Sequence, residues 1–223
     1  MVRVTTTPWT TVLFDVDGTL VDSATVVVRA FRETLADLGL RSRTDAELAA
    51  FVGPPLTTSF TALGLSGPAL EAAVSHYREI YHTLYLEPQV YPGIPELLAD
   101  LDDAGIVLAT ATSKQEYMAR DQLDHLGVLP HFRVVAGATP DPTCTKADVI
   151  RDALSRLGDA GARALRPVLV GDRRWDVEGG DAVGVPVIGA GWGYAAPGEL
   201  RGALALAPDV ASARDLLLGG ATA

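Results

Sequence analysis

A short apolar run that ends in two carboxylates and a glycine constrains this chain more than any other feature. Residues 11–14 form the run, and Asp15, Asp17 and Gly18 follow directly. Such a run, bounded by turn chemistry, is typical of a buried strand in a parallel sheet. Ligands bind beyond the carboxyl ends of the strands in sheets of this kind. We therefore expect Asp15 and Asp17 at the mouth of an active site.

The spacing of the two aspartates also suggests a cation. Alternation along a strand would point Asp15 and Asp17 to opposite faces, but a turn at Gly18 can bring both side chains toward one point. Two crowded carboxylates need a cation, and hard oxygen ligands suit Mg²⁺. Taken alone, the same residues also fit an ordinary polar turn at the end of a strand.

The next part of the chain has helical periodicity throughout. Beyond Asp22, apolar residues recur at helical spacing until Gly39 ends the run. Further helices are predicted over residues 45–52, 56–63 and 68–86, with no strand between them. Residues 22–87 are therefore predicted to form a small helical domain, inserted after the first strand of a core built from residues 1–21 and 88–223.

Beyond Pro92 and Gly93, strands and helices alternate. Strands are predicted over residues 106–111, 132–136, 168–171 and 185–189, and helices over 95–104, 115–126, 146–158, 176–183 and 211–218. Strands joined by single helices predict an α/β fold with a doubly wound parallel sheet and right-handed crossovers.

Polar residues follow several of the predicted strands. Thr112 and Ser113 come after one strand and before a helix, where a hydroxyl and free backbone N–H groups can bind phosphate. Thr112 could equally cap that helix. Asp172 and Asp176 follow another strand, and an N-cap with a first-turn acid explains them as well. Lys146 begins a predicted helix, where its charge opposes the helix dipole.

Taken in order, these segments resemble the four motifs of the haloacid dehalogenase-like hydrolases, most of which are phosphatases. The family pattern Asp-x-Asp-Gly-Thr-Leu is matched from Asp15 onward, and Gly-Asp-x-x-x-Asp is matched through Asp172 and Asp176. Thr112 and Lys146 stand at the second and third motifs. Many relatives have Lys-Pro at the third motif, whereas Ala147 follows the lysine here.

The resemblance implies a role for each motif. Asp15 would be the nucleophile and Asp17 the general acid and base. Thr112 would bind phosphate, with Ser113 as an alternative one residue further on. Lys146 would neutralise the phosphate and hold the nucleophile. Asp172 would complete, with Asp15 and Asp17, a site for Mg²⁺, and Asp176 would bind the ion or orient its waters.

The helical insertion would then be a cap over the active site. The turn Gly53-Pro54-Pro55 can be mere punctuation between helices. In capped relatives, a Gly-x-Pro-Leu loop dips into the site and helps to select the substrate, so these three residues are predicted to bind substrate.

The function implied is a Mg²⁺-dependent phosphatase of the phosphoglycolate phosphatase and 5′-nucleotidase branch, which acts on small phosphomonoesters through an aspartyl-phosphate. A phosphosugar mutase of the β-phosphoglucomutase type shares all four motifs and is the main alternative. A non-catalytic regulator on the same scaffold is a second alternative, which the intact motifs disfavour.

Composition narrows the partners. A net charge of −10 and a pI of about 4.7 disfavour nucleic acid polymers but leave a small phosphorylated metabolite open as substrate. The single Cys144 cannot form an internal disulfide. No signal peptide or membrane span is evident. We expect a cytoplasmic protein with no membrane partner, and the sequence makes no prediction of oligomeric state.

Two further sequence patterns are predicted to have a structural and not a catalytic role. Tyr77, Tyr81 and Tyr85 recur every four residues, which indicates helix packing, with the rim of the substrate site as the alternative. The glycine-rich residues 189–193 lack a suitable following helix and are not a dinucleotide fingerprint.

Overall fold

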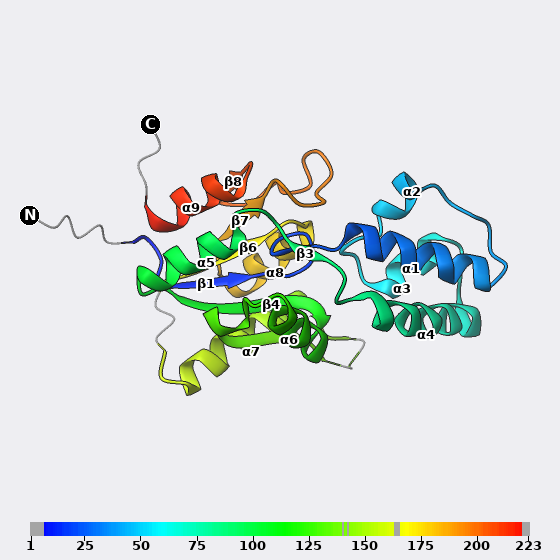
Figure 1. Cartoon of the computed structure of the whole chain (residues 1–223), viewed down its shortest axis with the longest axis horizontal. Coiled ribbons are helices and arrows are strands. Elements are labelled where there is room, and N and C mark those ends of the chain that lie inside the picture. The colour runs from blue at the N-terminus through cyan, green and yellow to red at the C-terminus, as the bar shows by residue number, and fades with distance from the viewer. Residues whose placement is uncertain (1–6, 140, 142, 163–165, 220–223) are drawn as a thin grey trace, which may run out of the picture.

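The core of the protein is a parallel six-stranded sheet in the order β5-β4-β1-β6-β7-β8. The computed structural model describes residues 7–139, 141, 143–162 and 166–219 (Figure 1). The strands are β1 (Thr11–Phe14), β4 (Val107–Gln115), β5 (Phe132–Ala138), β6 (Pro167–Gly171), β7 (Val187–Ala190) and β8 (Ala205–Ala207). The predicted doubly wound α/β fold is confirmed.

Helices cover both faces of this sheet, because successive strand residues point to opposite sides. Val12 and Phe14 of β1 belong to one buried cluster and Leu13 to another. The first cluster includes residues of α5 (Ile94–Asp103), α6 (Glu116–His125) and α9 (Val210–Leu218), and the second those of α7 (Lys146–Asp159) and α8 (Arg174–Val183). A 3₁₀ helix, η1 (Leu129–His131), precedes β5.

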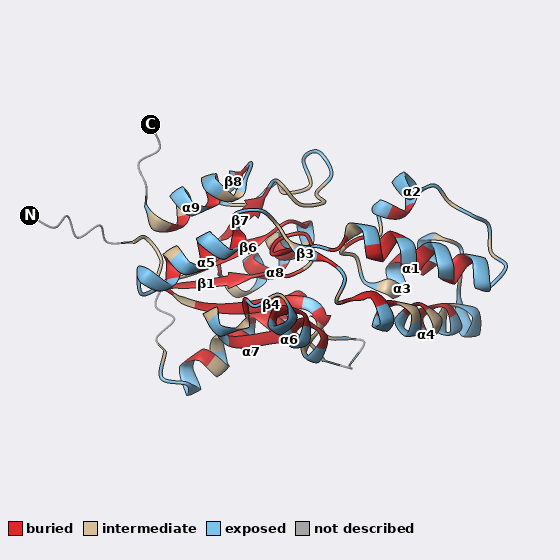
Figure 2. Ribbon diagram, viewed as in Figure 1, coloured by how far each residue is buried: buried red, intermediate tan, exposed pale blue. Residues whose placement is uncertain are grey.

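Four further helices form the predicted cap, which lies to one side of the sheet in Figure 1. They are α1 (Ala24–Asp37), α2 (Asp45–Ala49), α3 (Leu56–Ala62) and α4 (Gly67–Leu84). Their apolar faces meet in a core of their own (Figure 2). At its centre the ring of Phe31 lies 4.7 Å from that of Tyr77 and 5.1 Å from that of Phe60. Met118 of α6 belongs to the same buried cluster, so the packing of these four helices continues into the α/β core.

A short antiparallel ladder joins the cap to the core, where the sequence predicted no strand. It pairs β2 (Val21–Asp22) with β3 (Gln89–Val90). Each strand has two residues, too few to show a period, so the pattern could not reveal them. The ladder holds the entry and exit of the cap side by side.

Two other differences concern the core sheet. β4 continues beyond the predicted end at residue 111 to Gln115, with an irregular register against β5 between Thr112 and Gln115. The three-residue strand β8 at the sheet edge was not predicted. Among the described residues, no helix is long and apolar enough to cross a membrane.

Candidate active site

The carboxyl ends of three adjacent strands bring the predicted residues together. β4, β1 and β6 are neighbours in the sheet. Asp15 follows β1, Thr112 lies near the end of β4, and Asp172 follows β6. Lys146 is the first residue of α7, on the face of the sheet that α7 and α8 cover. Chain segments far apart in the sequence therefore meet at one edge.

Lys146 bridges two of the aspartates. Its Nζ lies 3.1 Å from Oδ1 of Asp15 and 2.5 Å from Oδ1 of Asp176, and its side chain is only 5% exposed. Burial opposes the charge on the ammonium, but the two carboxylates outweigh it and raise the pKa of Lys146 above its ordinary value. For Asp176, burial outweighs the attraction of Lys146 and raises the pKa to about 6.

Glycines make room for this ion pair. A Cβ on Gly171 would lie 2.2 Å from Cγ of Asp176, and a Cβ on Gly179 would lie 2.8 Å from Cγ of Lys146. Neither contact is sterically allowed, so any larger residue would displace the pair. The helix start itself is stabilised by a capping box between Thr145 and Asp148. The unfavourable position of Lys146 toward the dipole is thus offset locally.

Asp172 is fully buried, and its hydrogen-bond donors among the described residues are neutral. The hydroxyl of Thr19 donates to Oδ1 at 3.3 Å, and the backbone N–H of Tyr194 donates to Oδ2 at 2.8 Å. Burial, together with the charges of Asp176 and Asp15, raises the pKa of Asp172 well above its ordinary value. This carboxylate lacks a cation among the described side chains.

Asp172 also occupies a slot lined by two glycines. A Cβ on Gly18 would lie 2.2 Å from Oδ2 of Asp172, and a Cβ on Gly193 would lie 2.3 Å from its Cβ. Gly18 further has a φ of +82°, which side chains rarely adopt. The glycine-rich segment near residue 193 therefore serves close packing on this aspartate.

Together, one carboxylate oxygen from each of Asp15, Asp172 and Asp176 falls within 4.8 Å of the others. Three buried acids are faced by a single ammonium, so the donor set carries an excess of negative charge and fits a hard divalent cation. Asp15 is fixed within the cluster, since Oδ1 accepts the backbone N–H of Val16 at 2.8 Å.

Asp17 lies outside this cluster and has a different partner. Its Oδ1 accepts from Nζ of Lys114 at 2.8 Å, and its side chain is 21% exposed. The motifs predicted no role for Lys114. One signal was available, because the chain has sixteen arginines but only two lysines, Lys114 and Lys146.

The phosphate-binding hydroxyls predicted after residue 111 lie inside β4. Thr112 is buried, and its Oγ1 accepts the backbone N–H of Lys114 at 3.2 Å. Ser113 points the other way and is exposed. Thr112 is thus the hydroxyl on the buried side, as strand alternation requires.

The predicted substrate loop contacts the segment that carries Asp172. Gly53 and Pro54 are half-buried and Pro55 is exposed. A Cβ on Gly53 would lie 2.8 Å from Nη1 of Arg173, the residue after Asp172. Arg173 is itself held by Glu199, through Nε to Oε1 at 2.8 Å. The cap loop therefore lies against the core beside the acidic cluster.

The tyrosines that recur every four residues on α4 pack in the cap and also lie near the Lys114–Asp17 pair. Tyr77 and Tyr81 stack in the cap core with ring centroids 5.7 Å apart. Burial raises the pKa of both hydroxyls, and the negative charge of Asp17 raises it further. These tyrosines thus pack the cap and also approach Asp17.

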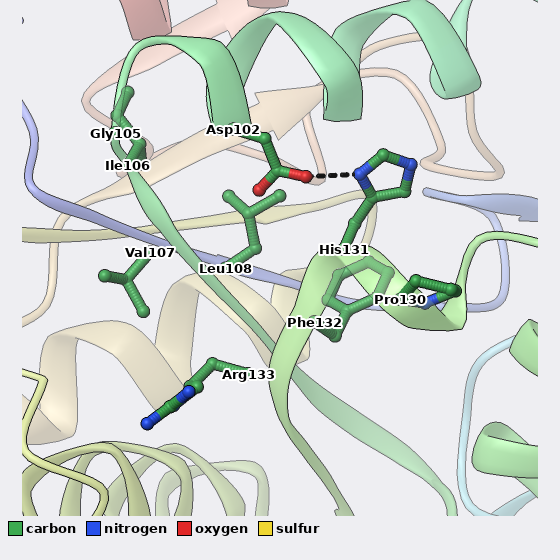
Figure 3. A pocket seen from close by; sticks show the side chains of 9 residues that line it. All are labelled: Asp102, Gly105, Ile106, Val107, Leu108, Pro130, His131, Phe132 and Arg133. Carbon is green, nitrogen blue, oxygen red and sulfur yellow. Dashed lines mark hydrogen bonds and ion pairs between the residues drawn. The ribbon is translucent and has the colours of Figure 1, made fainter.

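A hollow of about 520 Å³ lies elsewhere in the core, away from this site. It is lined by residues at the start of β4 and β5, among them Val107 and Phe132 (Figure 3). Asp102 and His131 form a hydrogen bond at its edge, with Oδ2 and Nδ1 2.5 Å apart. None of the predicted site residues lines this hollow.

Comparison with known proteins identifies the family. The sequence profile of the haloacid dehalogenase-like hydrolases matches residues 12–190. The chain belongs to this family. The resemblance read from the four motifs is therefore confirmed.

Several relatives are similar over most of the chain. The tyrosine-protein kinase PtkA of Mycobacterium tuberculosis is 41% identical over 184 residues, which cover 82% of this chain and 62% of that protein. A 5′-nucleotidase of Pseudomonas aeruginosa is 38% identical over 193 residues, or 85% of this chain and 86% of that protein. The crystal structure of a predicted phosphatase from Clostridium acetobutylicum has a TM-score of 0.87 at 31% identity and covers 95% of this chain and 99% of that one.

Proposed function

We propose that the protein is a Mg²⁺-dependent phosphatase that hydrolyses small phosphomonoesters through an aspartyl-phosphate on Asp15. The observation that carries this proposal is the position of Asp15. Its carboxylate faces the ammonium of Lys146 and belongs to a buried acidic cluster at the carboxyl edge of the sheet. Membership of a hydrolase family and similarity to a 5′-nucleotidase support it.

In the first step, Asp15 attacks phosphorus and the ester oxygen leaves. Among the described residues, both donors to Asp15 bind Oδ1, which leaves Oδ2 available as the nucleophile. Lys146 and the hydroxyl of Thr112 are proposed to compensate the charge of the phosphoryl group. Asp17 is proposed to protonate the departing alcohol.

In the second step, water hydrolyses the aspartyl-phosphate. Asp17, now a carboxylate, takes a proton from that water, and phosphate departs with Asp15 restored. Asp15, Asp172 and Asp176 would hold Mg²⁺, with Asp17 as a further predicted ligand. When bound, the cation supplies positive charge that offsets the acids and the phosphoryl oxygens.

The cap is proposed to select the substrate. Gly53, Pro54 and Pro55 form a cap loop in which Gly53 packs on Arg173, the residue after Asp172. Arg29 and Arg32 of α1 pair with acidic residues of the cap region, Glu33, Glu87 and Asp45, and are not proposed as ligands of the substrate. Contacts of the loop with the leaving group are therefore the favoured source of specificity.

A panel of phosphomonoesters tests the proposal. It includes p-nitrophenyl phosphate, 2-phosphoglycolate and nucleoside 5′-monophosphates, each with Mg²⁺ and with EDTA, and free phosphate is measured. We expect release that Mg²⁺ sustains and EDTA abolishes, and a phosphoryl group trapped on Asp15 by rapid quench and mass spectrometry. A flat response across the panel would support a non-catalytic protein.

Two further substrates separate the alternatives. β-Glucose 1-phosphate yields free phosphate from a phosphatase and glucose 6-phosphate from a mutase. ATP with a tyrosine peptide addresses the activity named for PtkA. We expect no phosphotyrosine, and its appearance would contradict simple hydrolysis as the function.

A further inference from the structure

The two lysines of this chain occupy equivalent places beside the two opening aspartates. Lys146 pairs with Asp15, and Lys114 pairs with Asp17. Both side chains are almost wholly buried, at 5% and 3% exposed. The other sixteen residues of the lysine and arginine total in the sequence are arginines. Lys146 has a role in the proposed mechanism, whereas that of Lys114 remains to be explained.

The amino group of Lys114 is held by contacts from three elements. Its Nζ lies 2.8 Å from Oδ1 of Asp17 and 2.5 Å from Oε1 of Gln122 on α6. The ring of Tyr81, on cap helix α4, lies 5.6 Å from Nζ, within the range of a cation–π contact. A buried ammonium with this many partners has one orientation, and so does the carboxylate that it binds.

The local fold explains how Lys114 reaches this place. The register of β4 against β5 is irregular between Thr112 and Gln115. Within this stretch Thr112 and Lys114 point to the buried side, and Ser113 points outward. One more residue would turn the side chain away from Asp17. The place of the Lys114 side chain is therefore set by the alternation of side chains along β4 and not by a flexible loop.

Gln122 connects this pair to the cap. Its side chain is fully buried, and its Nε2 donates a hydrogen bond to the backbone carbonyl of Tyr85. Tyr85 is the C-cap residue directly after α4, and the chain returns to the core just beyond it. A continuous path of polar contacts therefore runs from the end of the cap helix through Gln122 and Lys114 to Asp17.

We propose that Lys114 and Gln122 are positioning residues that orient the carboxylate of Asp17 and link its orientation to the seat of the cap. This rests on the proposed function, in which Asp17 exchanges a proton with the leaving group. With Oδ1 bound to Lys114, Oδ2 is free of donors among the described residues and can face the leaving oxygen. A shift at the end of α4 would move Gln122, then Lys114, and so Asp17.

Leaving-group dependence tests the positioning role. A nitrophenolate departs with little need of a proton, whereas the alcohol of a nucleoside monophosphate needs one. In Lys114→Met and Gln122→Met, we expect kcat for AMP to fall about tenfold further than the first turnover of p-nitrophenyl phosphate. KM should change much less. Gln122→Met retains the ammonium of Lys114. A larger loss on AMP than on p-nitrophenyl phosphate in this variant therefore reports the orientation of Asp17 and not a lost charge.

Two variants serve as controls. Lys114→Arg keeps a cation and should restore part of the AMP rate. Tyr85→Phe removes the hydrogen bond from the Tyr85 hydroxyl to Asp121, 3.2 Å long, but keeps the carbonyl that Gln122 binds. The ratio of the two rates should therefore match that of the wild type in Tyr85→Phe.

Amine reactivity gives a second readout that needs no activity. With two lysines, reductive methylation followed by mass spectrometry reports each one separately. Lys114 should react slowly in the wild type and faster in Gln122→Met, while Lys146 stays unchanged. A Lys114 that reacts freely in the wild type would overturn the proposed linkage even if the enzyme shows no turnover.

Three kinetic outcomes would also overturn it. Equal losses on both substrates would make Lys114 a structural residue only. A rise confined to KM would make it a substrate ligand. An unchanged rate ratio in Gln122→Met would remove the link to the cap. A wild type that hydrolyses nothing in the panel rejects the proposed function instead, and the methylation result then decides the linkage on its own.

Discussion

The amino group of Lys146 lies 3.1 Å from the carboxylate of Asp15, and the same ammonium also binds Asp176. The proposed nucleophile is therefore held by a cation that also binds a second acid. In the proposed mechanism, Lys146 both orients Asp15 and compensates negative charge.

We expect Lys146→Ala to lower kcat by about a hundredfold or more, as removal of other electrostatic stabilisers does. The position at a helix start suggested that the fold would tolerate this change or gain from it. The buried ion pairs indicate a loss instead, of about 3–5 kcal/mol, because Asp176 is left buried and unpaired. Kinetics and urea unfolding measure the two effects, and Lys146→Arg is the charge-retaining control. Normal turnover in Lys146→Ala would place the third motif elsewhere.

Gly18→Ala should abolish activity through its effect on Asp172. The new Cβ would lie 2.2 Å from Oδ2 of Asp172, on a backbone with φ +82°. Gly39→Ala is a matched control, since Gly39 has φ +63° but no atom within 4 Å of the added Cβ. Both variants should lose about 1 kcal/mol or more to backbone strain, but only Gly18→Ala should lose phosphatase activity and the stabilisation by Mg²⁺. Similar activity in the two variants would contradict the slot around Asp172.

The sequence predicted the elements whose signal is local. They include the apolar run of β1, the helical period of α1 and the residues that end each strand. The strand order of the structure then brings Asp15 and Asp172 to one edge of the sheet. The ladder of β2 and β3 was missed, because pairs of two residues are stabilised by the partner strand and have no period.

Lys114 was missed for a related reason. Its burial depends on the register of β4 against β5 and on Gln122 of α6, and both are contacts with other elements of the fold. The role of residues 189–193 could not be predicted either, since Gly193 packs against Asp172, which is distant in the sequence. Contacts between distant segments therefore account for most of what the motifs left open.

The metal-free protein should become less stable as the pH rises toward neutrality. The pKa of Asp176 is raised to about 6, and that of Asp172 is also raised. The folded state then binds more protons than the unfolded state above the ordinary carboxyl pKa, so the unfolding free energy falls as the pH rises through this window.

Asp172→Asn tests this sign directly. At about pH 7 without metal, the variant should melt several degrees higher than the wild type, and the difference should shrink as the pH falls toward about 5. Mg²⁺ should raise the melting temperature of the wild type but not that of the variant, which should also lack activity. Differential scanning fluorimetry across pH provides the measurement. Parallel curves for the two proteins would show that Asp172 is not a buried, destabilising charge.

The last prediction separates Asp15 from Asp17. Asp15→Asn removes the attacking oxygen, so all substrates should fail alike. Asp17→Asn keeps the nucleophile but removes the proton donor and the later base, so its defect should depend on the leaving group. With p-nitrophenyl phosphate, this variant should release a burst of nitrophenol and then turn over slowly, because nothing activates the water that hydrolyses the intermediate.

Rapid quench and peptide mapping should find the trapped phosphoryl group of Asp17→Asn on Asp15, whose Oδ2 has no donor among the described residues. Asp15→Asn should show neither burst nor label, and its unaltered Lys114–Asp17 pair makes it the matched control for folding. Label on Asp17 in the wild type or in Asp15→Asn, or turnover by Asp15→Asn, would falsify the assignment of the nucleophile. A burst without label on Asp15 would point to direct attack by water, since the covalent step alone explains both observations together.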